Sequence, residues 1–313
     1  MRRLLWLPLL LVSSLALAQE CTSYVVVAVL DHTTGDEIEN LKLEDFTARS
    51  GHTFLPLRSL DRKFANRLMV LLETDGASKS EKLSDEVDII TKLARQAPDG
   101  KPVSFGVYSQ RALFTKEFNP NEKERTAEIN GVVEEANSLG KRVALFDSLH
   151  EALEHFGPHQ PGDTVLLVAD PYDDISRHSV GDIEKEFVRT GTRLSVMLRS
   201  PLSRVSRDFM WNRHEREKAA FEQLSARTGG AYTIFGADLF RFPWKGYMLA
   251  VEVPKGYHPP MKWKLMLRDD APVWHRHPKL YYPEMLPPCS APPKPADPDD
   301  EPATTATAAS DKK

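Results

Sequence analysis

The segment Arg67–Ser80, RLMVLLETDGASKS, contains the strand around which the rest of the chain is organised. Leu68–Leu72 is a continuous apolar run, and such a run between turn residues indicates a strand buried on both faces of a parallel sheet. Polar residues follow it, and a helix is expected to begin near Lys79. Because ligands bind beyond the carboxyl ends of strands in an open α/β sheet, these polar residues are the first candidates for a site.

The polar residues after this strand allow two interpretations. The oxygen-bearing side chains belong to Glu73, Thr74, Asp75 and Ser78. Two carboxylates and several hydroxyls are able to hold a hard cation. The same groups are typical of a helix N-terminus, where they accept hydrogen bonds from free backbone N–H groups. Local chemistry alone favours capping over cation binding.

Strands and helices alternate through residues 66–240. Apolar runs predict further strands at 103–108, 164–169, 193–198 and 231–235, with 112–114 as a short hairpin partner of the first. Amphipathic spacing predicts helices at 81–96, 122–139, 144–156, 180–189 and 209–227. Alternating units of this length predict an α/β domain with a doubly wound, mainly parallel sheet.

The flanking segments differ from this domain in their sequence pattern. Residues 19–65 contain a β-branched run, YVVVAVL, and several turn clusters, which predict a β-rich segment. Residues 241–288 contain two alternating runs, 247–253 and 261–267, which are predicted to pair as a hairpin. Together the two segments are expected to form a small β-rich accessory part. Residues 289–313 are rich in Pro, Ala and Asp and are expected to be disordered.

Residues 1–18 have the pattern of a secretory signal peptide. A basic start, an apolar core and small residues near the end predict cleavage before Gln19 and export to the periplasm or the extracellular space. No other segment is long and apolar enough to cross a bilayer, so no transmembrane anchor is expected. Cys21 and Cys289 remain after cleavage and are candidates for a disulfide bond in an oxidising compartment.

The composition excludes some classes of function. With 27% charged and 41% hydrophobic residues, the 313-residue chain has the composition of a globular protein. A formal net charge of −4 gives no electrostatic support for a nucleic-acid partner. Neither a nucleophile elbow nor a glycine-rich phosphate loop is present, so no enzyme is expected. His150, His155 and His159 lie in or just after a predicted helix and are interpreted as surface residues.

Four stretches, in this order and spacing, resemble the von Willebrand factor A-related proteins that are abundant in acidobacteria. They are YVVVAVLDHTTGDEIENLKLEDFTARSGH (24–52), LMVLLETDGAS (68–78), LLVADPYDDIS (166–176), and LSARTGGAYTIF (224–235) with GYMLAVEVPKGYHPPMKWKLMLR (246–268) and PKLYYPEM (278–285). The resemblance implies a doubly wound α/β domain with a metal-ion-dependent adhesion site at the strand C-termini. In that family a D-x-S-x-S turn, a threonine and a later aspartate hold Mg²⁺, and the partner supplies a further carboxylate.

This chain departs from the ligand pattern that the resemblance implies. Glu73 stands at the place of the first aspartate, and Asp75 at that of the first serine. Ala77 replaces the second serine, with Ser78 one place out of register, and Val143 replaces the threonine. Because magnesium demands near-octahedral oxygen geometry, such losses weaken the prediction of a metal site.

The third loop keeps an aspartate, Asp170, at the expected place. The implied ligands for a divalent cation such as Mg²⁺ are therefore Glu73, Asp75, Ser78 and Asp170. Asp173 or Asp174 is an additional candidate ligand. The first hypothesis is nevertheless an exported, non-enzymatic binding protein that interacts with a protein or a surface polymer through a degenerate site without metal. The second is a metal-dependent adhesion module that uses this divergent ligand set, and a hydrolase is a remote third.

Overall fold

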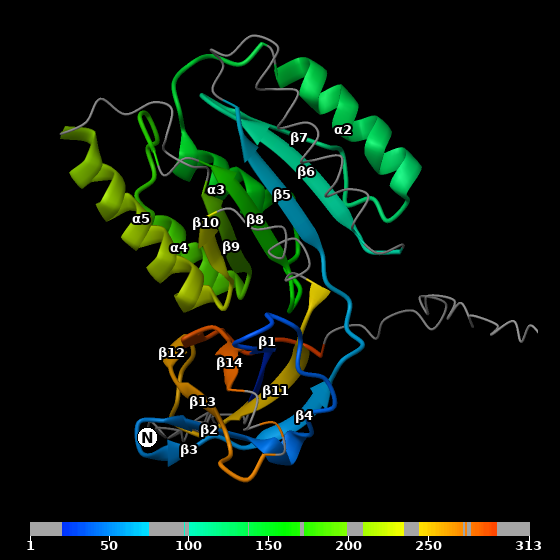
Figure 1. Cartoon of the computed structure of the whole chain (residues 1–313), viewed down its shortest axis with the longest axis vertical. Helices are drawn as coiled ribbons and strands as arrows, with labels where there is room; N and C mark the ends of the chain where they lie inside the picture. Colours follow the sequence, from blue (N-terminus) through cyan, green and yellow to red (C-terminus); the bar gives the residue numbers. More distant parts are fainter. Residues whose placement is uncertain are drawn as a thin grey trace, which may run out of the picture.

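The computed structural model describes residues 21–74, 97, 100–136, 138–169, 172–198, 209–234, 244–271, 273 and 277–292. They form an α/β domain and a β unit, the latter made of antiparallel strands from both ends of the chain (Figure 1). The helix predicted at 81–96 lies outside the described residues. Within the described ranges, none of the helices has the length and apolar content that a membrane span needs.

The described strands of the α/β domain form one six-stranded sheet with the order β10-β9-β8-β5-β6-β7. They span Leu68–Glu73 (β5), Val103–Tyr108 (β6), Ala112–Phe114 (β7), Thr164–Ala169 (β8), Arg193–Leu198 (β9) and Tyr232–Ile234 (β10). Neighbouring strands are parallel except β7, which turns back antiparallel to β6. The predicted doubly wound, mainly parallel sheet is confirmed.

Helices cover both faces of this sheet (Figure 1). They span Glu122–Ala136 (α2), Leu145–His155 (α3), Val180–Thr190 (α4) and Phe209–Thr228 (α5). Helix α2 packs on one face, and α3, α4 and α5 pack together on the other. These four helices lie where the amphipathic spacing predicts them, with ends that differ by a few residues at most.

Strand β5 takes the central position because its side chains are apolar on both faces. Leu68, Val70 and Leu72 enter the core on the α2 face, whereas Met69 and Leu71 enter the core under α3 and α4. Burial of each such side chain is worth about 1.5–3 kcal/mol relative to exposure. The neighbouring strand β8 is likewise buried along its whole length, so β5 and β8 together form the middle of the sheet.

The β unit combines strands from both ends of the chain. Its described strands form three sheets, with the orders β14-β1-β11-β4, β13-β2-β3 and β12-β15. The elements are Cys21–Asp31 (β1), the 3-10 helix Leu43–Asp45 (η1), Phe46–Ser50 (β2), Thr53–Phe54 (β3), Leu57–Asp61 (β4), Tyr247–Val253 (β11), Met261–Lys262 (β12), Lys264–Leu267 (β13), Pro278–Tyr281 (β14) and Met285–Leu286 (β15). The accessory part predicted from the N- and C-terminal segments is confirmed.

The predicted hairpin between residues 247–253 and 261–267 is wrong. Strand β11 lies between β1 and β4, and β13 pairs with β2 instead. In β11, YMLAVEV, every residue except Glu252 is buried, so the strand belongs in the middle of a sheet. Strand β13 exposes alternate side chains and lies at an edge, where one face meets solvent.

Cys21 and Cys289 form a disulfide bond, and their Cα atoms are 5.8 Å apart. Next to this bond, the N–H of Ser290 donates to the carbonyl of Thr22. The first residues of the segment that the sequence assigns to a disordered tail are therefore fixed to β1. The part of that segment beyond residue 292 lies outside the described residues.

Candidate functional site

The chain adds strands to one side of β5 first and to its other side afterwards, so the strand order reverses between β5 and β8. From β5 the chain continues outward through β6 and β7, then returns to β8 on the other side of β5. In open α/β sheets such a switch point creates a crevice beyond the carboxyl ends of the strands, where ligands bind. The opposite strand ends face the β unit, where Gly191 lies against Pro287. The carboxyl edge of the sheet, our candidate binding edge, therefore faces away from the β unit (Figure 1).

Glu73 and Thr74 bring β5 to this edge. Both residues are buried, with 2% and 3% of their surface exposed. The register pairs Glu73 with Tyr108 at the end of β6. The N–H and the hydroxyl of Thr74 both donate to the carbonyl of Tyr108, at 2.7 and 3.2 Å. The Thr74 hydroxyl therefore extends the β5–β6 pairing, and the Glu73 carboxylate lies at the switch point.

The loop that precedes α3 is tied to the end of β6. The carbonyl of Ser109 accepts the N–H of Ala144 at 2.7 Å, and its hydroxyl donates to the carbonyl of Gly140 at 2.7 Å. Between these bonds Val143, 5% exposed, packs into the core under α3. An apolar side chain thus fills the place where the family resemblance expects a threonine ligand.

Side chains from the loop after β8 cap the N-terminus of α3. The helix's own N-cap residue, Ala144, makes no side-chain hydrogen bond. Asp173 Oδ1 accepts the N–H of Leu145 at 2.9 Å, and Ser176 Oγ accepts the next two backbone N–H groups at 3.0 and 3.1 Å. Ser176 Oγ also donates to Asp173 Oδ1 at 2.5 Å. Because the first N–H groups of a helix need external partners, these bonds fix the loop against α3.

Asp147, in the first turn of α3, holds the other end of the same loop. Its Oδ1 accepts the backbone N–H groups of Arg177 and His178, both at 3.0 Å, and lies 2.7 Å from His178 Nδ1. Partial burial opposes ionisation of Asp147, but the hydrogen bonds from His178 and Arg177 outweigh it. The pKa of Asp147 is therefore lowered.

His150 connects α3 to α4 beside this loop. Its Nδ1 lies 2.8 Å from Glu186 Oε2, and its ring stacks on that of His178 with a centroid distance of 4.3 Å. The hydrogen bond with Glu186 is the main cause of the raised pKa of His150. Carboxylates and imidazoles therefore join α3, α4 and the loop into one unit.

His150, His155 and His159, which the sequence assigns to the surface, are half-buried, and His155 and His159 contact side chains from other parts of the chain. The His155 ring stacks on Phe114 at 5.1 Å, and its Nε2 lies 3.1 Å from Ser104 Oγ. Burial is the main cause of the lowered pKa of His155. His159 Nδ1 lies 3.2 Å from Thr192 Oγ1, and burial, with nearby arginines, lowers the pKa of His159 to about 4. Helical spacing alone does not show that a β hairpin and a neighbouring loop cover these rings.

The structure describes one member of the predicted ligand set. Glu73 lies at the switch point, whereas Asp75, Ser78 and Asp170 lie outside the described residues. Across the described ranges, no three His, Cys, Asp or Glu side chains form a group that could hold a metal ion. Glu73 alone does not make the multi-oxygen shell that magnesium requires.

Asp173 and Asp174, the additional candidate ligands, have other roles. Asp173 caps α3, and Asp174 Oδ2 lies 3.1 Å from Arg142 Nε. The sequence reasoning missed this cap, although a signal for it exists. The start of α3, RVALFD, has no Ser, Thr, Asp or Asn at the N-cap, so its partners had to come from elsewhere in the chain.

No family model and no curated protein matches the chain. Similar solved structures include BatB from Bacteroides thetaiotaomicron, which is 12% identical with a TM-score of 0.41 and covers 56% of this chain and 94% of its own. A von Willebrand factor type A protein from Catenulispora acidiphila is 9% identical with a TM-score of 0.46, covering 86% of this chain and 74% of its own.

A third similar structure is proximal thread matrix protein 1 from the mussel byssus, described with a zinc-occupied MIDAS motif. It is 13% identical with a TM-score of 0.44, covering 62% of this chain and 48% of its own. The doubly wound fold of the present chain follows from its own strand order and register. Proteins of the von Willebrand factor A type are thus among the solved structures to which this chain is similar.

Proposed function

We propose that this chain is an exported, non-enzymatic binding protein of the von Willebrand factor A type. It binds a protein or a surface polymer at the carboxyl edge of its sheet, and it does so without a metal ion. The sequence resemblance in four ordered stretches and the switch point between β5 and β8 support this proposal.

One observation carries the metal-free part of the proposal. In the described residues, protein groups hold the loop before α3 against residues 172–176, which come after β8. Asp173 and Ser176 cap α3, the Val143 carbonyl accepts the N–H groups of Asp174 and Ile175 at 2.8 and 3.1 Å, and the Val143 side chain is apolar. Because hydrogen bonds within the protein already order the described part of this edge, little conformational entropy is lost there when a partner binds.

A capture experiment tests the edge. The chain from Gln19 onward is immobilised with its disulfide intact and exposed to the exported fraction of its source organism, in EDTA or in Mg²⁺. The double variant Lys141→Glu, Arg142→Glu reverses two exposed charges at the edge. Lys185→Glu with Arg189→Glu is the matched control, since it also reverses two exposed charges, on α4.

The expected result is a ligand that the wild type and the control retain equally in EDTA and in Mg²⁺, and that the edge variant loses. Equal retention by the edge variant would contradict binding at this edge. Retention only in Mg²⁺ would contradict the metal-free mode.

Export is supported by the signal-peptide pattern of residues 1–18 and by the Cys21–Cys289 disulfide, because disulfides persist in oxidising compartments. The expected finding is mature protein outside the cytoplasm that begins at Gln19. N-terminal sequencing of fractionated cells checks this. Full-length protein in the cytoplasm with reduced cysteines would refute export.

Metal-dependent adhesion is the second candidate function. The observation that favours it is the buried Glu73 carboxylate at the switch point. In that case Mn²⁺ or Mg²⁺ raises the melting temperature by linkage, and Glu73→Gln removes the rise. A shift that persists in Glu73→Gln would place the ion elsewhere.

A further inference from the structure

The small sheet β13-β2-β3 presents an unusual outer face. Side chains alternate between the two faces of a strand. Phe46, Ala48, Leu265 and Leu267 are buried in the core of the β unit. The residues between them therefore point outward, namely Thr47, Arg49, Lys264 and Met266.

A row of two cations and one aromatic ring crosses this outer face. The register places Lys264 opposite Arg49, and Arg49 opposite Phe54. Like charges directly opposite each other destabilise a sheet. Within the described ranges, Arg49 and Lys264 have no ion-pair partner, and Phe54, 72% exposed, is the one large hydrophobic side chain that is exposed. Like-charged neighbours that lower stability, next to an exposed aromatic ring, are typical of a binding surface.

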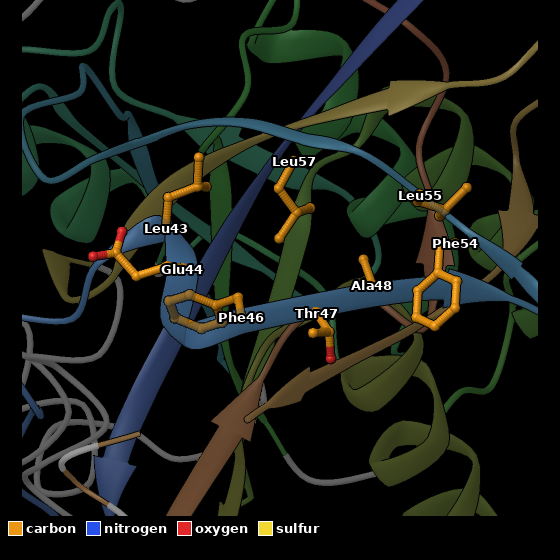
Figure 2. A pocket seen from close by; sticks show the side chains of 8 residues that line it. All are labelled: Leu43, Glu44, Phe46, Thr47, Ala48, Phe54, Leu55 and Leu57. Atoms are coloured by element: carbon orange, nitrogen blue, oxygen red, sulfur yellow. The ribbon is translucent and has the colours of Figure 1, made fainter. Parts of the chain in front are cut away.

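An apolar hollow lies beside this row. Its volume is about 370 Å³, and Phe54, Leu43, Leu55 and Leu57 are among the side chains that line it. Figure 2 shows Thr47 on one side of the β2 ribbon, Ala48, Leu55 and Leu57 on the other, and the Phe54 ring across the ribbon. The hollow therefore extends from the exposed face around the edge of β2, and it has room for an apolar side chain.

The two ends of the outer face differ in charge. At the end of the face away from Arg49, a second hollow of about 460 Å³ is lined by Thr47, Met266, Asp269, Asp270 and Arg268, and Arg268 forms an ion pair with Asp270. Glu44 lines the apolar hollow. The two cations Arg49 and Lys264 therefore attract an anionic ligand to their end of the face, whereas Arg268 partly offsets the carboxylates at the other end.

We propose that this face, the Arg49–Lys264–Phe54 row with the adjacent hollow, docks an acidic peptide segment of a partner protein. A carboxylate of the peptide lies between Arg49 and Lys264, where a guanidinium favours bidentate contact. An apolar side chain next to that carboxylate enters the hollow beside Phe54. The hollow favours a peptide over an acidic polysaccharide, because a chain of acidic sugars carries no apolar side chain to fill it.

This inference rests on the proposed role as a binding protein, and it gives that role a second surface, distant from the sheet edge. The test is fluorescence anisotropy with a labelled peptide in which leucine is flanked by pairs of aspartates. Comparison peptides carry asparagine for aspartate or serine for leucine, and polygalacturonate is offered as the polysaccharide. The variants are Arg49→Ala with Lys264→Ala, and Phe54→Ala alone. Lys185→Ala with Arg189→Ala is the matched control, since it removes two exposed cations from α4.

The acidic peptide is expected to bind the wild type and the control alike. The Arg49→Ala, Lys264→Ala pair and Phe54→Ala are each expected to weaken binding at least about tenfold, the scale of a hot-spot residue. Both comparison peptides are expected to bind more weakly than the acidic one. The melting temperature of the Arg49→Ala, Lys264→Ala variant is expected to equal or exceed that of the wild type, because the like-charge pair is removed, so its lost binding does not reflect misfolding.

Equal binding by the cation variant or by the asparagine peptide would overturn the proposal. Polygalacturonate binding as tightly as the peptide would assign the face to a polysaccharide and would also overturn it. The Lys141→Glu, Arg142→Glu variant is expected to keep full peptide affinity. A result that overturns peptide docking on this face is therefore distinguishable from a result that overturns binding at the sheet edge.

Discussion

Arg67 and Asp163 form a bidentate ion pair that joins the start of β5 to the start of β8. Arg67 Nε and Nη2 donate to the two carboxylate oxygens of Asp163 at 2.9 and 2.6 Å. The guanidinium also donates to the carbonyls of Phe156 and Pro158, both at 2.8 Å, and lies 5.2 Å from the ring centroids of Phe118 and Phe156. Asp163 is fully buried, and Arg67 is 16% exposed. This pair sets the two strands of the switch point side by side.

Arg67→Met is expected to destabilise the protein by about 3–5 kcal/mol, because it leaves the buried Asp163 carboxylate without its partner. Urea unfolding followed by circular dichroism measures the loss. Arg268→Met is the control, since Arg268 pairs with Asp270 on the surface and such pairs contribute at most about 1 kcal/mol. Equal effects of the two substitutions would contradict the role given to the Arg67–Asp163 pair.

Stability is expected to fall on acidification through His159. Burial lowers the pKa of His159 from 6.5 to about 4, so the folded state binds fewer protons than the unfolded state between these values. The contribution is complete above about pH 6.5 and is lost as the pH falls toward 4. His159→Gln should flatten this part of the profile of unfolding free energy against pH. A wild-type unfolding free energy that does not change between pH 6.5 and pH 4 would refute the prediction.

Asp173→Ala and Ser176→Ala are each expected to cost about 1 kcal/mol, the usual loss for a helix cap. Because Ser176 donates to Asp173, the double variant should lose less than the sum of the single losses. A double-mutant cycle in urea measures this coupling. Asp174→Ala removes only an ion pair with the exposed Arg142 and is expected to have a much smaller effect. Strict additivity would show that the two side chains do not act as one cap.

Replacement of Cys21 and Cys289 by serine is expected to lower stability by about 5 kcal/mol, as chain-entropy models give for a cross-link across so long a loop. The two residues are 268 apart in the sequence. Unfolding curves with and without reductant check this value. The reductant should lower the stability of the wild type and leave the double serine variant unchanged.

The sequence predicts the α/β domain well because its strands are apolar on both faces. The runs at Leu68–Leu72 and Thr164–Ala169 have no solvent-exposed face, so their sequences fit only central positions in a sheet. Prediction fails in the β unit, where partners are far apart in the chain. Tyr247–Val253 pairs with Cys21–Val27 across more than two hundred residues, and no local pattern encodes such a pairing.

The candidate site was only partly predictable for a related reason. Glu73 is the end of a recognisable strand, so its place at the edge follows from the sequence. The caps that Asp173 and Ser176 provide depend on how a distant loop meets α3, and spacing does not reveal this. The burial of His155 likewise depends on Phe114 and Phe118, which come from another part of the chain.

A thermal melt of the mature protein in EDTA and in millimolar Mg²⁺, repeated on Asp170→Ala, tests the metal-free binding edge most directly. Because only ligands that bind the folded state raise the melting temperature, we predict the same melting temperature with and without metal for both proteins. A rise in Mg²⁺ that disappears in Asp170→Ala would contradict this prediction, and the edge would then be a metal-dependent adhesion site.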